Sequence, residues 1–206
     1  MTTKPRVFLV DDQDAILKAL SRLLISAELD VTSFHSAQDF LDSGNTNAPG
    51  CLVLDLAMPG MTGMNLQQQL VSMSSDLPII FLTGNGSIDS SVQAMKMGAQ
   101  DFLTKPVDSD KLLAAIQTAF ASNQQARQVR AERDDVSLRI ASLTPREHEV
   151  LLLISEGKLN KQVADHMGIA EKTIKVHRAR VMSKMGAKSL AALIHQMEKL
   201  KKSTLS

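Results

Sequence analysis

The chain of 206 residues suits one large domain or two small ones, and its 22% of charged residues argues against a disordered chain. It has one cysteine, no signal-peptide core and no apolar stretch near the roughly 18 residues that cross a bilayer, so we expect a cytoplasmic protein without a membrane segment or internal disulfide. The net charge of +1 is unevenly distributed: residues 1–120 contain 7 basic and 13 acidic side chains, and residues 143–206 contain 12 basic and 6 acidic ones. This distribution favours a cation site in the first half and a site for a polyanion in the second.

Short apolar runs alternate with amphipathic stretches through the first 120 residues. The apolar runs are typical of buried strands, and the stretches between them have helical spacing. The predicted strands span residues 6–10, 31–34, 51–54, 77–82 and 101–104, and the predicted helices span 14–27, 36–41, 62–73, 87–97 and 108–120. Five strands that alternate with five helices predict an α/β fold with a doubly wound parallel sheet.

Four of these strands end on polar side chains: Asp11 and Asp12 follow the first, Asp55 the third, Thr83 the fourth and Lys105 the fifth. The carboxyl ends of parallel strands share one edge, so we expect these groups to converge. Three carboxylates repel one another unless a cation intervenes, and Mg²⁺, which prefers oxygen ligands and accepts phosphate oxygens, suits them. Asp55 is then the candidate nucleophile for phosphorus, with Lys105 and Thr83 binding the phosphoryl oxygens. The alternative is an aspartate that merely opens a turn.

A polar segment follows the last of these helices. Residues 120–142 are rich in Gln, Ala and Arg and lack Gly and Pro, so they are expected to extend the preceding helix. Apolar residues at spacings of three and four indicate weak coiled-coil character, although Arg133 interrupts them. We expect a helical linker over residues 122–142, with a solvated linker as the alternative.

The remaining residues predict four short helices. The first starts strongly at Thr144-Pro145 and runs to about residue 156, and the others cover 160–167, 171–185 and 190 onward. Asn160 is expected to cap the second helix, which Gly168 closes. Two short helices joined by a tight, glycine-bearing turn predict a helix-turn-helix.

The third of these helices has an apolar face and a basic face. Ile174, Val181 and Met185 would pack it against the other helices. The outward face holds small or basic side chains, namely Lys172, Lys175, Val176, Ala179, Arg180 and Ser183. Such a helix can enter a major groove without a clash, whereas an ordinary solvated helix would mix both signs of charge.

Residues 5–121 resemble the receiver domain of two-component response regulators. The matching motifs are Asp11-Asp12, Asp55 followed by Met58-Pro59-Gly60, Thr83-Gly84, and Phe102 three residues before Lys105-Pro106. The resemblance implies that Asp55 accepts a phosphoryl group from the phosphohistidine of a histidine kinase. It also implies Mg²⁺ bound by Asp12, Asp55 and the backbone carbonyl of Ala57, with Asp11 acting through water, and a cis Lys105–Pro106 peptide.

By the same analogy, phosphorylation draws Thr83 toward the phosphoryl oxygens and lets Phe102 turn inward. This would alter a surface that includes Ile88, Val92 and Met95 and drive formation of a homodimer; a static core aromatic is the alternative for Phe102. Ala57 and Asn85 flank the route of attacking water and are expected to set the lifetime of the phosphorylated state. Beyond phosphoryl uptake and self-dephosphorylation no enzyme activity is expected, since an aspartate-nucleophile phosphatase usually needs a second acid where Ala57 stands.

Residues 143–200 resemble the LuxR-type helix-turn-helix in three motifs, which are Leu143 to Glu147, Asn160-Lys161 and Thr173 to His177. Both resemblances together point to the FixJ/NarL class of response regulator, nearest the FixJ type, with a receiver over 1–121, a linker over 122–142 and a DNA-binding domain over 143–206. They imply base-edge contacts by Lys175, Val176, Ala179 and Arg180 and phosphate contacts by Lys161, Thr173, His177 and Lys184, with Lys172 on the same surface. Ala170 departs from the family, which commonly caps this helix with a hydroxyl residue.

The predicted function is a phosphorylation-controlled transcription factor with Mg²⁺ as its cofactor. Its expected partners are a histidine kinase, promoter half-sites in double-stranded DNA about one helical turn apart, a second copy of itself and RNA polymerase. An RNA- or protein-binding output from the helical half is the alternative.

Overall fold

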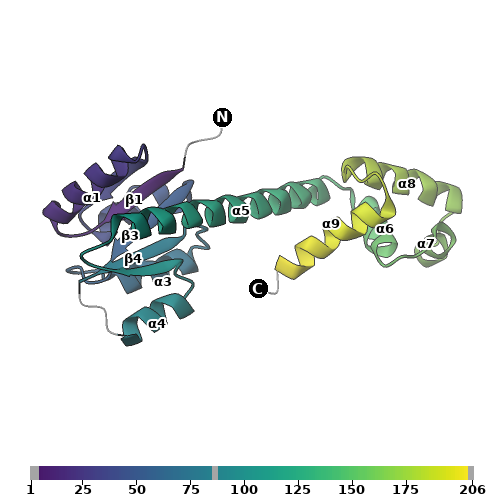
Figure 1. Cartoon of the computed structure of the whole chain (residues 1–206). Coiled ribbons are helices and arrows are strands. Elements are labelled where there is room, and N and C mark those ends of the chain that lie inside the picture. Colours follow the sequence, from purple (N-terminus) through teal and green to yellow (C-terminus); the bar gives the residue numbers. More distant parts are fainter. Residues whose placement is uncertain (1–4, 85–87, 204–206) are drawn as a thin grey trace. The chain divides into compact units, whose positions relative to one another are not determined.

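The computed structural model of the chain describes residues 5–84 and 88–203 (Figure 1). It forms two compact units, Met1–Arg127 and Gln128–Ser206, and the boundary falls inside the predicted linker. The expected role of Asn85 and the expected helix start at Ser87 concern residues outside the described range. Among the described helices, none is both long and apolar enough to span a membrane.

The first unit contains a five-stranded parallel sheet. Its strands are β1 (Arg6–Val10), β2 (Asp30–Phe34), β3 (Gly50–Asp55), β4 (Ile79–Thr83) and β5 (Asp101–Thr104). They lie in the order β2-β1-β3-β4-β5, which is the flavodoxin-like doubly wound topology. The predicted fold class is therefore confirmed for this unit. The fourth strand begins two residues later than predicted, because Leu77 and Pro78 lie in the preceding loop.

Helices cover both faces of this sheet. They are α1 (Asp14–Ser26), α2 (Ala37–Asp42), α3 (Gly63–Ser72), α4 (Ile88–Lys96) and α5 (Ser109–Ala141), with a short 3₁₀ turn at Asn45–Asn47. Alternate strand residues point to opposite faces, so two apolar cores form. Phe8 and Leu52 belong to the core under α2, α3 and α4, and Val7 and Cys51 to the core under α1 and α5.

Cys51 is fully buried in β3, as its place in an apolar run predicted. Burial raises the pKa of its thiol to about 12, because the thiolate would lose its hydration. The side chain therefore fills the core as a neutral group.

Helix α5 is one continuous helix from Ser109 to Ala141, so the predicted helical extension is confirmed (Figure 1). Within the first unit, the buried Asn123 fixes its fourth turn. Asn123 Oδ1 accepts from Gly50 N–H at 3.0 Å, and its Nδ2 donates to the Asp76 carbonyl at 2.6 Å. In the second unit, Val136 and Ile140 pack against the helical core, whereas Val129 and Leu138 are exposed. The apolar residues predicted at spacings of three and four thus pack against the helical core in the last turns of α5.

In the described part of the second unit, α5 is followed by α6 (Pro145–Ser155), α7 (Asn160–Met167), α8 (Glu171–Lys184) and α9 (Leu190–Ser203). Thr144 caps α6 with a reciprocal Thr144–Glu147 capping box, as the sequence predicted. The predicted buried face of α8 is confirmed, since Ile174, Val181 and Met185 are fully buried.

The predicted cap by Asn160 is wrong. Leu159 occupies the N-cap position of α7, and Gln162 reaches back to accept from its backbone N–H at 2.9 Å. Asn160 is the first helical residue, and its side-chain oxygen accepts from Arg178 at 3.0 Å. Asn160 therefore ties α7 to α8, a long-range contact that competes with local capping.

Candidate functional site: an acidic pocket and a basic helix

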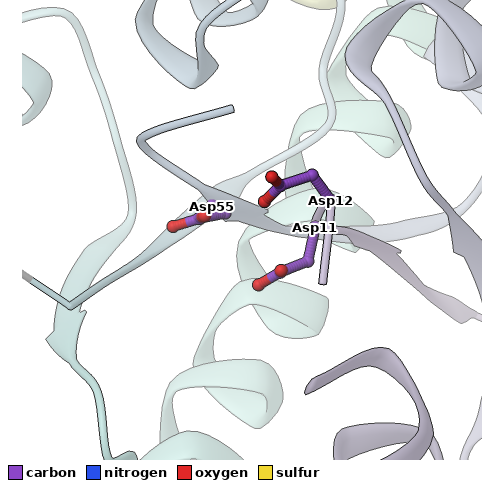
Figure 2. Close-up of side chains that lie close together, drawn as sticks. All are labelled: Asp11, Asp12 and Asp55. Atoms are coloured by element: carbon purple, nitrogen blue, oxygen red, sulfur yellow. The ribbon is translucent and has the colours of Figure 1, made fainter. Parts of the chain in front are cut away.

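The strand register places two carboxylates side by side at the carboxyl edge of the sheet. Val10 pairs with Leu54, so Asp11 and Asp55 each stand one residue further along neighbouring strands. Figure 2 shows the side chains of Asp11, Asp12 and Asp55 close together. Their carboxylate oxygens lie within 4.8 Å of one another. Asp11 and Asp55 are buried and Asp12 is exposed, so the cluster has one side open to solvent.

Lys105 completes this cluster from the end of β5. Its Nζ lies 2.6 Å from Asp11 Oδ2 and 3.3 Å from Asp55 Oδ1. The backbone holds it there, because Lys105 N–H donates to the Thr83 carbonyl at 2.7 Å. The Lys105–Pro106 peptide is cis, as the resemblance implied.

The charges of this pocket do not balance. Burial raises the pKa of Asp55 above its ordinary value; the Lys105 ammonium lowers it, and the Asp11 carboxylate raises it again. One ammonium faces three carboxylates, which leaves an excess of negative charge beside a solvent-open edge. This all-oxygen donor set fits a hard dication such as Mg²⁺.

Thr83 and Phe102 lie on the neighbouring strands. Thr83 is buried at the end of β4, one residue beyond Leu82, which pairs with Asp55. Phe102 pairs with Phe81 in the sheet, and their ring centroids are 6.2 Å apart with planes at 42°. The Phe102 ring is half-buried, so it has both a core contact and an exposed edge.

Two backbone contacts that shape the pocket are not predicted by the sequence motifs. Gly63, the first residue of α3, lies so close to Asp55 that an added Cβ would stand 2.4 Å from the Asp55 carbonyl oxygen. Gln13 N–H donates to Asp11 Oδ1 at 2.9 Å and orients that carboxylate. The glycine eight residues after Asp55 is the sequence signal for the contact at Gly63. No residue pattern predicts the hydrogen bond from Gln13 to Asp11.

Most of the predicted DNA-contacting residues are exposed in the second unit. The exposed members are Lys161 on α7 and Lys172, Thr173, Lys175, Val176, Ala179, Arg180 and Lys184 on α8. His177 is half-buried, and its Nδ1 is buried without a hydrogen-bond partner. Lys175 pairs with Glu171 at 3.4 Å, an exposed ion pair that contributes little and leaves the ammonium available. As predicted, Ala170 offers no side-chain cap to α8.

Lys184 differs from the other basic residues of α8. Its Nζ lies 2.6 Å from the buried Glu147 and donates to the Ser142 carbonyl at 3.0 Å. The hydrogen bond from Lys184, helped by the backbone N–H of Thr144, lowers the pKa of Glu147 to about 2. Lys184 therefore already neutralises a buried carboxylate of its own unit.

Comparisons with known proteins identify the domain types of both units. Residues 7–117 match the response regulator receiver domain, and residues 141–197 match the luxR family of bacterial regulatory proteins. The chain is 42% identical to the response regulator protein TodT of Pseudomonas putida F1, over 96% of this chain and 87% of TodT. It is 41% identical to the transcriptional regulatory protein FixJ of Bradyrhizobium diazoefficiens, over 94% of this chain and 95% of FixJ.

Solved structures show the same relationship. The response regulator StyR superposes with a TM-score of 0.85 at 45% identity, covering 96% of this chain and 100% of the StyR chain. Full-length FixJ from B. japonicum gives a TM-score of 0.59 at 39% identity, covering 98% and 99%. The chain therefore belongs to the response regulators that join a receiver domain to a LuxR-type DNA-binding domain, a family that controls transcription in response to phosphorylation.

Proposed function

We propose that Asp55 is the phosphoacceptor of this response regulator and that a histidine kinase is its phosphoryl donor. The observation that carries the proposal is the cluster of Asp11, Asp12 and Asp55 at the carboxyl edge of the sheet, where the Lys105 ammonium pairs with Asp11 and Asp55. A carboxylate of Asp55 attacks the phosphorus of a phosphohistidine, an O–P bond forms, and the N–P bond breaks to release the imidazole.

The other pocket residues act on the transferred group. Lys105 balances the charge of the phosphoryl oxygens, and the Thr83 hydroxyl donates to one of them. Asp12, Asp55 and the Ala57 carbonyl would hold Mg²⁺, with Asp11 acting through water; the ion would screen the charge between the attacking carboxylate and the phosphoryl oxygens. Ala57 leaves no acid two residues after Asp55, so hydrolysis of the aspartyl phosphate is not assisted from that position.

Signal output is proposed to follow from the half-buried Phe102. Inward rotation of this ring, as Thr83 moves toward the phosphoryl group, would change the surface next to α4, where Val92 and Met95 are exposed. We infer that this surface then forms a homodimer. The dimer would present two copies of α8 to promoter half-sites, with RNA polymerase as the next partner.

The exposed basic face of α8 supports duplex DNA as the ligand of the second unit. Lys175, Val176, Ala179 and Arg180 would face base edges, and Lys161, Thr173 and His177 would contact phosphates. Lys172 is predicted to belong to the same surface, and the resemblance predicts a phosphate contact by Lys184.

The linker bounds of 122–142 and a cytoplasmic location also remain predictions.

A direct experiment tests both halves of the proposal. Full-length protein is incubated with acetyl phosphate and Mg²⁺, and its mass, oligomeric size and affinity for duplex DNA are measured. We expect a mass gain of one phosphoryl group, a dimer and tighter binding, with all three responses lost in Asp55→Ala or with EDTA. A wild-type protein that takes up no phosphoryl group under these conditions would refute the acceptor role.

The output has its own control. Lys175→Ala should weaken duplex binding without changing phosphoryl uptake. Competition by structured RNA as strong as that by duplex DNA would instead support an RNA-binding output.

A further inference from the structure

The C-terminal ends of α5 and α8 cap each other in the second unit. Arg139, in the last turn of α5, donates from Nη1 to the carbonyl of Met185, the residue that follows α8, at 2.8 Å. Lys184, the last residue of α8, donates from Nζ to the carbonyl of Ser142, the residue that follows α5, at 3.0 Å. Each helix thus supplies a cation to the carbonyl that terminates the other.

Helix chemistry explains why this exchange is favourable. The last carbonyls of a helix lack partners within the helix and carry partial negative charge. A Lys or Arg side chain both donates a hydrogen bond to them and offsets that charge. Because both cations come from the partner helix, neither cap forms unless α5 and α8 are docked together.

The surrounding residues hold both cations in place. Asp135 Oδ2 lies 2.8 Å from Arg139 Nη2, and Glu147 Oε2 lies 2.6 Å from Lys184 Nζ. Gly186 leaves the space that the guanidinium occupies, since a Cβ at that position would stand 2.3 Å from Arg139 Nη1. Apolar packing runs alongside, because Val136 and Ile140 contact the core that includes the buried residues of α8.

We propose that Arg139 and Lys184 are positioning residues for DNA binding, which fix α8 by reciprocal capping with the end of α5, and that Lys184 acts through this cap rather than as a phosphate ligand. This inference rests on the proposed contact between α8 and duplex DNA. It differs from the family resemblance, which implies that Lys184 binds a phosphate.

The salt dependence of DNA affinity separates the two roles of Lys184. Each phosphate contact adds about 0.9 to the slope of log affinity against log salt concentration. Affinities of the full-length protein are measured in a salt series on a duplex that the phosphorylated wild type selects from a random pool. We expect Lys161→Gln to reduce the slope by about one, and Lys184→Gln and Arg139→Gln to weaken binding about tenfold at fixed salt with the slope unchanged.

Hydrogen exchange provides a second readout that a loss of charge alone would not move. Arg139→Gln should speed exchange at the end of α8, and Lys184→Gln should speed exchange at the end of α5. Arg139→Lys should restore most of the affinity, because a lysine can still donate to the Met185 carbonyl.

Glycine variants test the same cap without removing a charge. Gly186→Ala should displace Arg139 and weaken DNA binding. Gly157→Ala is its matched control, because Gly157 also has a positive φ, of 84°, but its added Cβ meets nothing within 4 Å. We expect this control to leave DNA affinity within about twofold of the wild type.

Three results would overturn the inference: a slope change of about one in Lys184→Gln, an unchanged affinity in Arg139→Gln, or faster exchange confined to the substituted helix. Failure of the proposed DNA contact looks different, because Lys161→Gln and Lys175→Ala would then also bind duplex as well as the wild type.

Discussion

Gly63 lies directly against the carbonyl group of Asp55, with no room for a side chain between them. A Gly63→Ala substitution places a Cβ 2.4 Å from the Asp55 oxygen and 3.1 Å from a ring carbon of Phe81. The backbone must shift to relieve this contact, at a cost of about 1–3 kcal/mol. We expect the variant to take up phosphate from acetyl phosphate at least tenfold more slowly, as followed by mass spectrometry.

Gly44→Ala is the control for general destabilisation. Gly44 has a positive φ of 71° and open space around its Cα, so alanine there costs about 1 kcal/mol without touching Asp55. It should lower the melting temperature and leave the uptake rate unchanged. Equal uptake by both variants would show that Gly63 does not position the phosphoacceptor.

Phe102 can be tested with a fluorescent ring, because the chain has no Trp or Tyr. In Phe102→Trp the single indole would start half-exposed, as Phe102 is. We expect its emission to shift to shorter wavelength when Mg²⁺ and acetyl phosphate are added, and not to shift when Asp55→Ala is also present. Constant emission despite a measured mass gain would identify position 102 as a static core site.

The pair of Glu147 and Lys184 makes the stability of the second unit depend on pH. Glu147 has a folded-state pKa of about 2 against an ordinary value of 4.5. A lowered pKa stabilises the fold fully above the ordinary value, and the contribution is lost as pH falls from about 4.5 toward 2.

Glu147→Gln cannot ionise and therefore isolates this effect. Scanning calorimetry of the full chain should show the wild type melting above the variant at pH 6, with the gap narrowing as pH approaches 2. A difference in melting temperature between the wild type and Glu147→Gln that stays constant with pH would contradict the lowered pKa of Glu147.

Asn123 should stabilise the first unit through its two long-range hydrogen bonds. Asn123→Ala leaves the buried Gly50 N–H without this partner, at a cost of about 1–3 kcal/mol, and also removes the part-buried hydrogen bond to the Asp76 carbonyl. Calorimetry should show a lower melting temperature for the first unit. Gln124→Ala, an exposed position next to it, should melt like the wild type.

The fold of the first unit and most of its pocket could be predicted because the information is local. A buried parallel strand is a run of apolar residues, and four of the five strands here end at or immediately before a polar residue of the pocket. Once the strands are known to be parallel, Asp55 and Lys105 must lie at the same edge. The buried face of α8 was equally predictable, since Ile174 and Val181 follow helical spacing.

What escaped prediction depends on contacts between distant residues. Asn123 stands among polar residues of an otherwise solvent-facing segment. Its partners are Gly50 at the start of β3 and Asp76 in the loop before β4, which lie 73 and 47 residues away in the chain. Lys184 has the sequence context of a DNA-binding cation, but its partner Glu147 lies 37 residues earlier. The local chemistry of Asn160 predicts a helix cap, but its side chain instead accepts a hydrogen bond from Arg178.

The enclosed thiol of Cys51 should react slowly with thiol reagents in the folded protein, because the side chain has no exposed surface and burial disfavours the thiolate. The rate at which an aromatic disulfide labels the protein therefore reports how often the central strand separates from its neighbours. A cysteine introduced at the surface could likewise carry a probe at a single site without removing the native one.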